Sequence, residues 1–194
     1  MATLWQRHFH TLFKPIPRDA TVSDRAVRLG FGGRFADEVL SGLPGVLMPT
    51  FRATLGLSYA QISLLRLALD YVAFVIEPIA GLLIDVLQRR WLLAWGAFFT
   101  ALSVILMGLA PTFLLLSLAF AVYGLGSGPL AHTADVVLVE AHPEAPDRIF
   151  ARATMLDTTG ALLSPLLVTA ALWSGLSWRL PLLASGAAGL LYAL

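Results

Sequence analysis

Six apolar segments of about membrane-crossing length, joined by short polar turns, are the feature that most constrains this chain. They lie near residues 35–54, 59–87, 91–110, 113–139, 153–173 and 178–194. A helix needs roughly 20 apolar residues to cross the hydrocarbon of a bilayer, whereas a β-barrel strand has about ten residues of alternating character. The pattern therefore predicts an all-α membrane protein with six antiparallel transmembrane helices, and hence a lipid bilayer as its first partner.

The composition supports the same class and excludes others. Hydrophobic residues make up 58% of the 194 residues and charged residues 13%, against about 45–50% and about 25% in ordinary soluble domains. A net charge of +1 without a dense basic face argues against a nucleic-acid partner. With no cysteine, no Walker loop and no HExxH motif, the sequence predicts neither an enzyme nor a bound metal or cofactor.

Arginine and lysine are distributed unequally between the two sides of the predicted bundle. One side holds Arg7, Lys14, Arg18, Arg25, Arg28, Arg34, Arg89, Arg90, Arg148 and Arg152, and the other holds Arg52 and Arg179. Because basic loops stay in the cytoplasm, we expect a multi-pass protein of the cell membrane with its N-terminus and C-terminus on the cytoplasmic side.

Two regions follow from this layout: a cytoplasmic N-terminal segment, residues 1–30, and a six-span bundle, residues 31–194. The N-terminal segment is either a poorly ordered tail or an interfacial helix, since four apolar side chains share one side of a short helix. They are Trp5, Phe9, Leu12 and Phe13. The last apolar segment ends without a polar flank, and this predicts a chain cut at the end of its sixth span.

Residues 81–90 resemble the signature loop of the major facilitator superfamily, which has a glycine, three residues, an aspartate and a basic cluster between spans two and three. Gly81, Asp85, Arg89 and Arg90 match, whereas Val86 and Gln88 depart from the pattern.

Three further stretches resemble that family in the expected order: the glycine-rich run 124–129, the acid-then-arginine loop 140–152 and the Trp-Arg pair at 178–179. The resemblance implies two inverted three-helix repeats and alternating-access transport of a small molecule. It also implies a second six-span half and contacts between helix ends that gate the path. For those contacts we single out Gly81, Asp85, Arg89, Arg90, Glu140, Arg148 and Arg152.

Residues 56–61 and 124–127 are also similar to drug-efflux members of the fosmidomycin-resistance type. Two other interpretations stay open. The chain is either a half-size protein that pairs with a second copy, or a six-span scaffold or receptor-like protein without a transport cycle.

Glycine and proline interrupt the first, fourth and fifth apolar segments. The residues are Gly42, Pro44 and Gly45, then Gly124, Gly126, Gly128 and Pro129, and finally Pro165. Paired interruptions in the first helix of each repeat indicate helix breaks along a substrate path. The alternative is close helix packing through small residues.

Charged and titratable side chains inside the spans are the candidates for a substrate or proton pathway, because each charge costs at least about 2.5–3.5 kcal/mol to insert. They are Asp37, Glu38, Arg66, Asp70, Glu77, His132, Asp135 and Asp157. The i, i+4 spacing of Arg66 and Asp70 predicts an ion pair, either lining the cavity or static between helices.

Asp37 and Glu38 differ by about 100° of helix rotation, so we expect only one of them to face the cavity. A carboxylate in a dry cavity can exchange a proton near neutral pH, because desolvation disfavours its charged form. One of the two is therefore a proton or cation site, or both are partners of Arg34 and of the fifth span. His132 either titrates with Asp135 or has a packing role, and we expect Asp157 to face Asp135 or Arg152.

Overall fold

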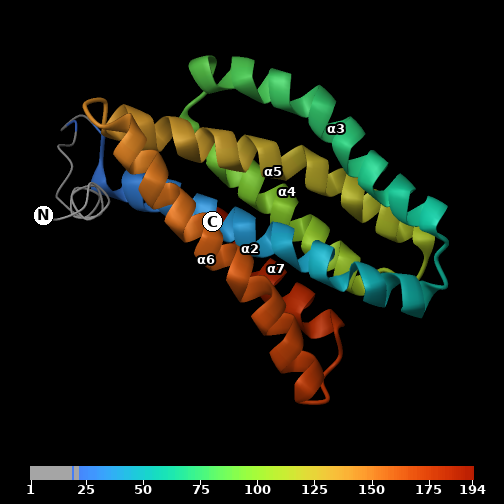
Figure 1. Ribbon diagram of the computed structural model, residues 1–194. Coiled ribbons are helices and arrows are strands. Elements are labelled where there is room, and N and C mark those ends of the chain that lie inside the picture. Colours follow the sequence, from blue (N-terminus) through green and yellow to red (C-terminus); the bar gives the residue numbers. More distant parts are fainter. Residues whose placement is uncertain (1–18, 20–21) are drawn as a thin grey trace, which may run out of the picture.

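The computed structural model describes residue 19 and residues 22–194, so the predicted interfacial helix in residues 1–18 lies outside the described part. The described residues form helices and short connections, without a strand among them. The helices are α2 (Asp24–Leu55), α3 (Tyr59–Val86), α4 (Arg89–Leu109), α5 (Phe113–Ala141), α6 (Pro146–Trp173) and α7 (Arg179–Ala193). Successive helices run in opposite directions (Figure 1).

The helix ends follow from local sequence signals. Gly56, with φ 62°, adopts the left-handed conformation that ends α2. Ser58 then caps α3 in a reciprocal capping box with Gln61. Thr112 accepts a hydrogen bond from the backbone N–H of Leu115 at the start of α5. These short signals fix where the chain turns and make neighbouring helices antiparallel.

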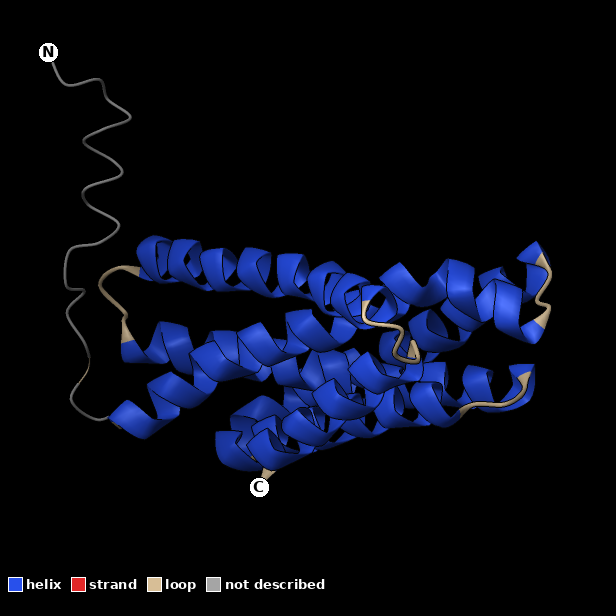
Figure 2. Ribbon diagram, turned by 90° about the horizontal axis from the view of Figure 1, so that it is seen from below, coloured by secondary structure: helices blue, strands red, loops and turns tan. Residues whose placement is uncertain are grey.

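The helices pack around α5, which has α4 on one side and α3 on the other (Figures 1 and 2). Helix α2 lies against α5 and α6, and α7 lies mainly against α4. Phe51 of α2 is fully buried and makes an edge contact with Phe120 of α5, with ring centroids 6.5 Å apart. Helices α3 and α6 therefore form the two outer arms of the molecule.

The predicted helix breaks are wrong, because α2, α5 and α6 are continuous through Pro44, Pro129 and Pro165. A proline inside a helix removes one backbone hydrogen bond, and neighbouring helices can compensate for that loss in a membrane. The glycines instead lie where helices approach closely.

Four of these glycines leave no room for a side chain. A Cβ atom at Gly42 would lie 2.6 Å from Ser164 Oγ of α6, and one at Gly124 would lie 2.6 Å from the Leu69 carbonyl oxygen of α3. At Gly126 it would lie 2.6 Å from the Gly96 carbonyl oxygen of α4, and at Gly128 it would lie 2.6 Å from Glu77 Cγ. Gly45 differs, because no described atom lies within 4 Å of a Cβ placed there.

Four helices, α3 to α6, are long and apolar enough to cross a membrane by length and composition. Six such helices were predicted, and α2 and α7 do not meet this criterion within the described residues. Helix α2 carries charged residues along its first half. Helix α7 has 15 residues, about 22 Å of helix at 1.5 Å per residue, against roughly 17–25 residues in a typical span.

Candidate functional site

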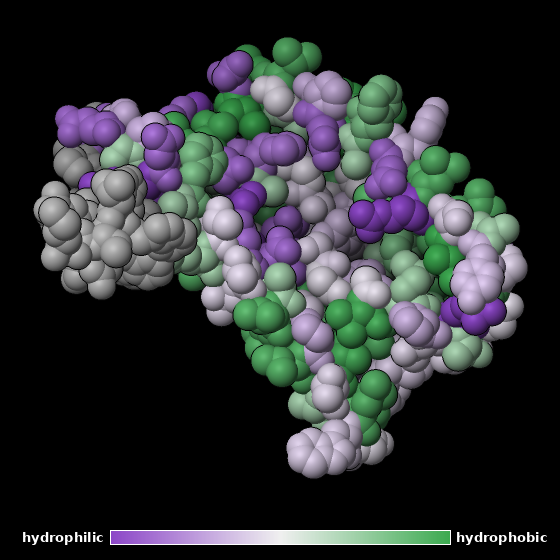
Figure 3. Space-filling model, viewed as in Figure 1, coloured by the Kyte–Doolittle hydropathy of each residue, from purple (hydrophilic) through white to green (hydrophobic). Residues whose placement is uncertain are grey.

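Polar side chains gather on the face of the molecule between the two outer arms. Figure 3 shows hydrophilic residues along a hollowed band in the middle of this face, with apolar surface beside it. Helices α2, α5 and α6 supply the charged groups there, and α3 runs along the upper edge of the view in Figure 1. We call five of these groups the polar cluster: Arg34, Asp37, Glu38, Asp135 and Asp157.

Arg34 is the centre of the polar cluster. Its Nη1 atom lies 3.4 Å from Asp135 Oδ2 of α5, and its Nη2 atom donates a hydrogen bond to Asp157 Oδ2 of α6. The side chains of Arg34, Asp135 and Asp157 are 23%, 25% and 15% exposed. One guanidinium therefore ties three helices together, in a setting where ion pairs are less screened than on an open surface.

The two adjacent carboxylates of α2 face different neighbours. Asp37 Oδ1 accepts a hydrogen bond from Ser127 Oγ of α5 at 3.0 Å. Glu38 lies toward α6, where its Cβ would be 3.1 Å from a Cβ added at Gly160. Both of them interact electrostatically with Arg34 and Asp157.

Tyr123 of α5 lies one turn before Ser127 and is 5% exposed. Its hydroxyl interacts with the hydroxyl groups of Ser127 and Ser41, and electrostatically with Asp37 and Glu38. Tyr123 therefore joins the polar groups of α5 to those of α2 beside the two adjacent carboxylates.

The polar cluster extends from the middle of the helices toward one end of the bundle. Asp37 is residue 14 of the 32 in α2 and Asp157 is residue 12 of the 28 in α6, whereas Asp135 is residue 23 of the 29 in α5. Charged groups inside apolar helices need partners, which come from neighbouring helices or from a ligand.

The predicted pathway residues of α3 lie apart from the Arg34 contacts. Arg66 Nε lies 3.8 Å from Asp70 Oδ1, as its spacing predicted, but the side chains are 71% and 57% exposed. Such a pair contributes little to stability. Glu77 packs against Gly128 of α5. His132 of α5 is exposed and interacts electrostatically with Asp135.

The predicted helix-end contacts are present only in part. Arg89 Nη2 at the start of α4 lies 2.5 Å from Glu140 Oε1 at the end of α5. Arg90 lies over the ring of Trp91, 5.3 Å from its centroid. Asp85 is exposed and forms no ion pair within the described residues.

Gly81 and the two arginines of α6 complete the predicted set. A close helix approach at Gly81 was predicted and is absent within the described part of the chain, where the space around it is open. Arg148 and Arg152 lie on the first two turns of α6, and both are half-buried.

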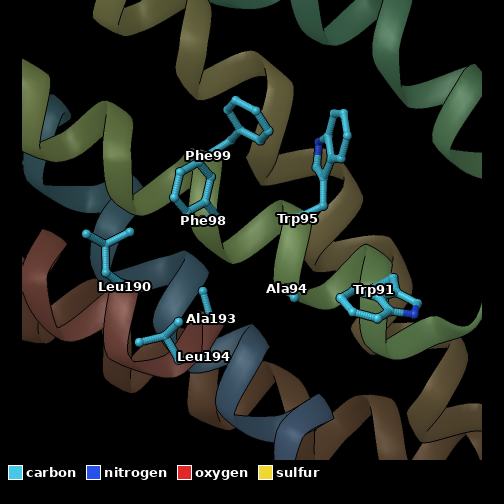
Figure 4. Close-up of a pocket in the computed structure, with 8 residues that line it drawn as sticks. All are labelled: Trp91, Ala94, Trp95, Phe98, Phe99, Leu190, Ala193 and Leu194. Atoms are coloured by element: carbon cyan, nitrogen blue, oxygen red, sulfur yellow. The ribbon is translucent and has the colours of Figure 1, made fainter.

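A separate, apolar pocket of about 520 Å³ lies between α4 and α7 (Figure 4). It is lined by Trp91, Ala94, Trp95, Phe98, Phe99, Leu190, Ala193 and Leu194. It contains no charged side chain and does not overlap the polar cluster. Within the described residues, no group of three His, Cys, Asp or Glu side chains is placed to hold a metal ion.

The sequence analysis named Arg34 only as an alternative partner of Asp37 and Glu38, and it missed Ser127 and Tyr123. An arginine inside an apolar helix was the available signal for Arg34, because such a charge needs a partner. Serine and tyrosine are common in spans of all kinds, so nothing in the sequence distinguished Ser127 or Tyr123.

Residues 31–194 match the family model of the Major Facilitator Superfamily. The match covers all six described helices except the first turns of α2. Members of this family are membrane transporters rather than enzymes. With this match and its apolar helices, the chain belongs to the major facilitator superfamily of membrane transport proteins.

Proposed function

We propose that this protein carries out secondary active transport of a small molecule by alternating access, with the polar cluster at the centre of the path. The observation that carries the proposal is the meeting of Arg34, Asp135 and Asp157 from three helices, with Asp37, near the middle of α2, interacting electrostatically with Arg34. In secondary transporters, substrate and coupling-ion sites lie near the middle of the bilayer.

We also propose that all six helices cross the cell membrane, with both termini in the cytoplasm. Helix α2 has 32 residues, which is long enough to cross. The cost of inserting its charges is offset by the partners that α5 and α6 supply. Arg25, Arg28, Arg89, Arg148 and Arg152 lie at one end of the bundle, and Arg52 and Arg179 lie at the other, a distribution that supports this orientation.

A second six-span half, in the same chain or in a second copy, is the partner that we propose for the hollow face. The apolar windows of α3 and α6 are largely unburied, and Gly81 and Asp85 are exposed at the end of α3. These surfaces are available to such a half, whose rocking against this one would open the cluster to each side in turn. Following the resemblance to efflux members, we propose export of a drug or metabolite.

For coupling to protons, Asp37 is the group that we propose, because it lies near the middle of α2 and bonds to α5 through Ser127. Protonation would remove one negative charge from the cluster and weaken the hydrogen bond that Asp37 accepts from Ser127, which loosens α2 from α5 and gives a physical basis for a conformational change.

The test is proton movement in vesicles that contain the complete protein and an internal pH-sensitive dye. We expect added substrates to start proton flux with the native protein, and Asp37→Asn to reduce that flux at least tenfold. Asp147→Asn is the matched control, since Asp147 is an exposed carboxylate in the first turn of α6. Unchanged coupling in Asp37→Asn would exclude this residue as the proton site. No compound-dependent flux across a broad panel would contradict the transport function itself.

A further inference from the structure

The polar cluster carries an excess of negative charge. Arg34 interacts electrostatically with Asp37, Asp135 and Asp157, and Glu38 interacts with Arg34 and Asp157. One guanidinium thus faces four carboxylates, which gives a formal charge of −3 when all are ionised.

Other charged groups lie on the same helices and on α3. Arg152 and Arg148 of α6 precede Asp157 by five and nine residues, which places them about 140° and 180° around the helix from it. Glu77 of α3 packs on Gly128. His132 of α5 interacts electrostatically with Asp135.

Several polar atoms in and beside the cluster lack a partner within the described residues. They include Asp135 Oδ1 and Asp157 Oδ1, the oxygens that do not contact Arg34, and each is fully shielded from solvent. A ligand with several N–H donors or a positive charge would bind to these unpaired carboxylate oxygens of α5 and α6.

We infer that the transported substrate is an organic cation, with an ammonium, quaternary ammonium or guanidinium group that binds between Asp135, Asp157 and Asp37. This inference rests on the proposed transport function and names its substrate class. A cation would offset the excess charge that otherwise opposes closing the site away from water. The absence of a three-ligand metal grouping among the described residues favours an organic cation over a coordinated metal ion.

The same charge balance indicates which ion is transported in the direction opposite to the organic cation. When the cation leaves, the carboxylates of the empty cluster have to be neutralised before the site can be buried again, and protons are the available cations. Exchange of an organic cation for protons keeps the number of charges in the site close to constant through the cycle.

Binding to the purified complete protein in detergent tests the inference, with cations compared to isosteres of different charge. The first pair is tetraphenylphosphonium and tetraphenylborate, and the second is choline and its neutral analogue 3,3-dimethylbutanol. We expect saturable binding of at least one cation, at least tenfold tighter than its isostere, by equilibrium dialysis. Lack of preference for the cation in both pairs would overturn the inference.

Three variants separate the cluster from general effects of charge. Asp157→Asn should weaken cation binding at least tenfold, while Asp157→Glu, which keeps the charge, should retain most of it. Asp147→Asn should leave binding unchanged. Equal losses in Asp157→Asn and Asp147→Asn would show that overall charge attracts the cation, and the inference would fail. Thermal melting of each variant identifies any that do not fold, and Asp135→Asn then takes the place of Asp157→Asn.

The vesicle experiment distinguishes this inference from the transport function. Proton-coupled flux of neutral or anionic compounds alone would refute the cationic substrate and leave the transport function standing. Cation binding without compound-dependent flux would refute the transport function and leave the binding site standing.

Discussion

Arg34 holds two carboxylates that belong to two other helices, and the stability of this contact depends on all three groups. Removing the guanidinium leaves Asp135 and Asp157 facing each other in a site that is largely shielded from water. Uncompensated buried charge is among the most damaging consequences of a single substitution.

We therefore expect Arg34→Gln to destabilise the protein strongly, by up to the roughly 3–5 kcal/mol that loss of one partner costs in a buried pair. Combining it with Asp157→Asn should cost less than the sum of the two single changes, because the second change removes one of the stranded charges. Thermal melting in detergent measures both. Arg66→Gln, in the exposed pair of α3, is the control and should change stability little. Additive losses would mean that Arg34 and Asp157 act independently.

At this scale the sequence predicted which residues are unusual but not which of them meet. Asp37, Asp135 and Asp157 stand out because they are charged within apolar segments. Two interpretations were open for Asp37 and Glu38: one of them faces the cavity, or both pair with Arg34. The outcome depends on the rotation of the helices and on partners up to 123 residues away in the sequence. That information is in the tertiary packing, so Ser127 and Tyr123 could not be found beforehand.

Helix α5 owes its contacts on both sides to glycine, and this is the main feature at the scale of elements. Gly126 brings α5 against the backbone of α4, and Gly124 and Gly128 bring it against α3. Without a hydrophobic driving force between helices in lipid, such close backbone contact supplies much of the attraction.

Gly126→Ala should destabilise the bundle by about 1–3 kcal/mol, because the added Cβ meets backbone atoms of Thr100 and Gly96 that cannot move aside. Gly45→Ala is the matched control, since no described atom lies within 4 Å of its Cβ position and alanine favours a helix by about 1 kcal/mol. We expect it to be neutral or slightly stabilising. Comparable losses from both substitutions would contradict the assigned role of close packing at Gly126.

The glycine and proline runs also show why helix breaks were predicted wrongly. Residues that interrupt a helix and residues that let two helices touch are the same small residues, and sequence spacing does not separate the two uses. The connections were easier, because Gly56, Ser58 and Thr112 act through their immediate neighbours. Hydropathy likewise located the apolar helices. It did not show that α4 is packed in the interior and that α3 is largely unburied.

The whole molecule has basic residues at one end and few at the other, and this distribution supports the proposed orientation in a bilayer. The chain contains no cysteine, so a single introduced cysteine reports on one position alone. Pro111 and Glu144 are both exposed, and they lie in the connections at opposite ends of α5.

In intact cells, a membrane-impermeant maleimide should label Pro111→Cys readily. Glu144→Cys should react only after the membrane is permeabilised, because its connection lies with the basic end of the bundle. Gel shift of the labelled protein measures both. The reverse pattern would invert the proposed orientation, and equal labelling of both would contradict a crossing by α5.

The distance along the chain between Arg34 and Asp157 has a consequence for how the protein is made. The two residues are 123 positions apart, and ribosomes add about 5–20 residues per second, so roughly 6–25 s pass before Arg34 can meet this carboxylate. In α3, by contrast, Arg66 and Asp70 pair within the helix itself, so α3 does not have to wait for a later helix. We expect α2 to remain in the translocon or at the bilayer surface until α5 and α6 emerge, and the bundle to be assembled only after Asp157 has been synthesised.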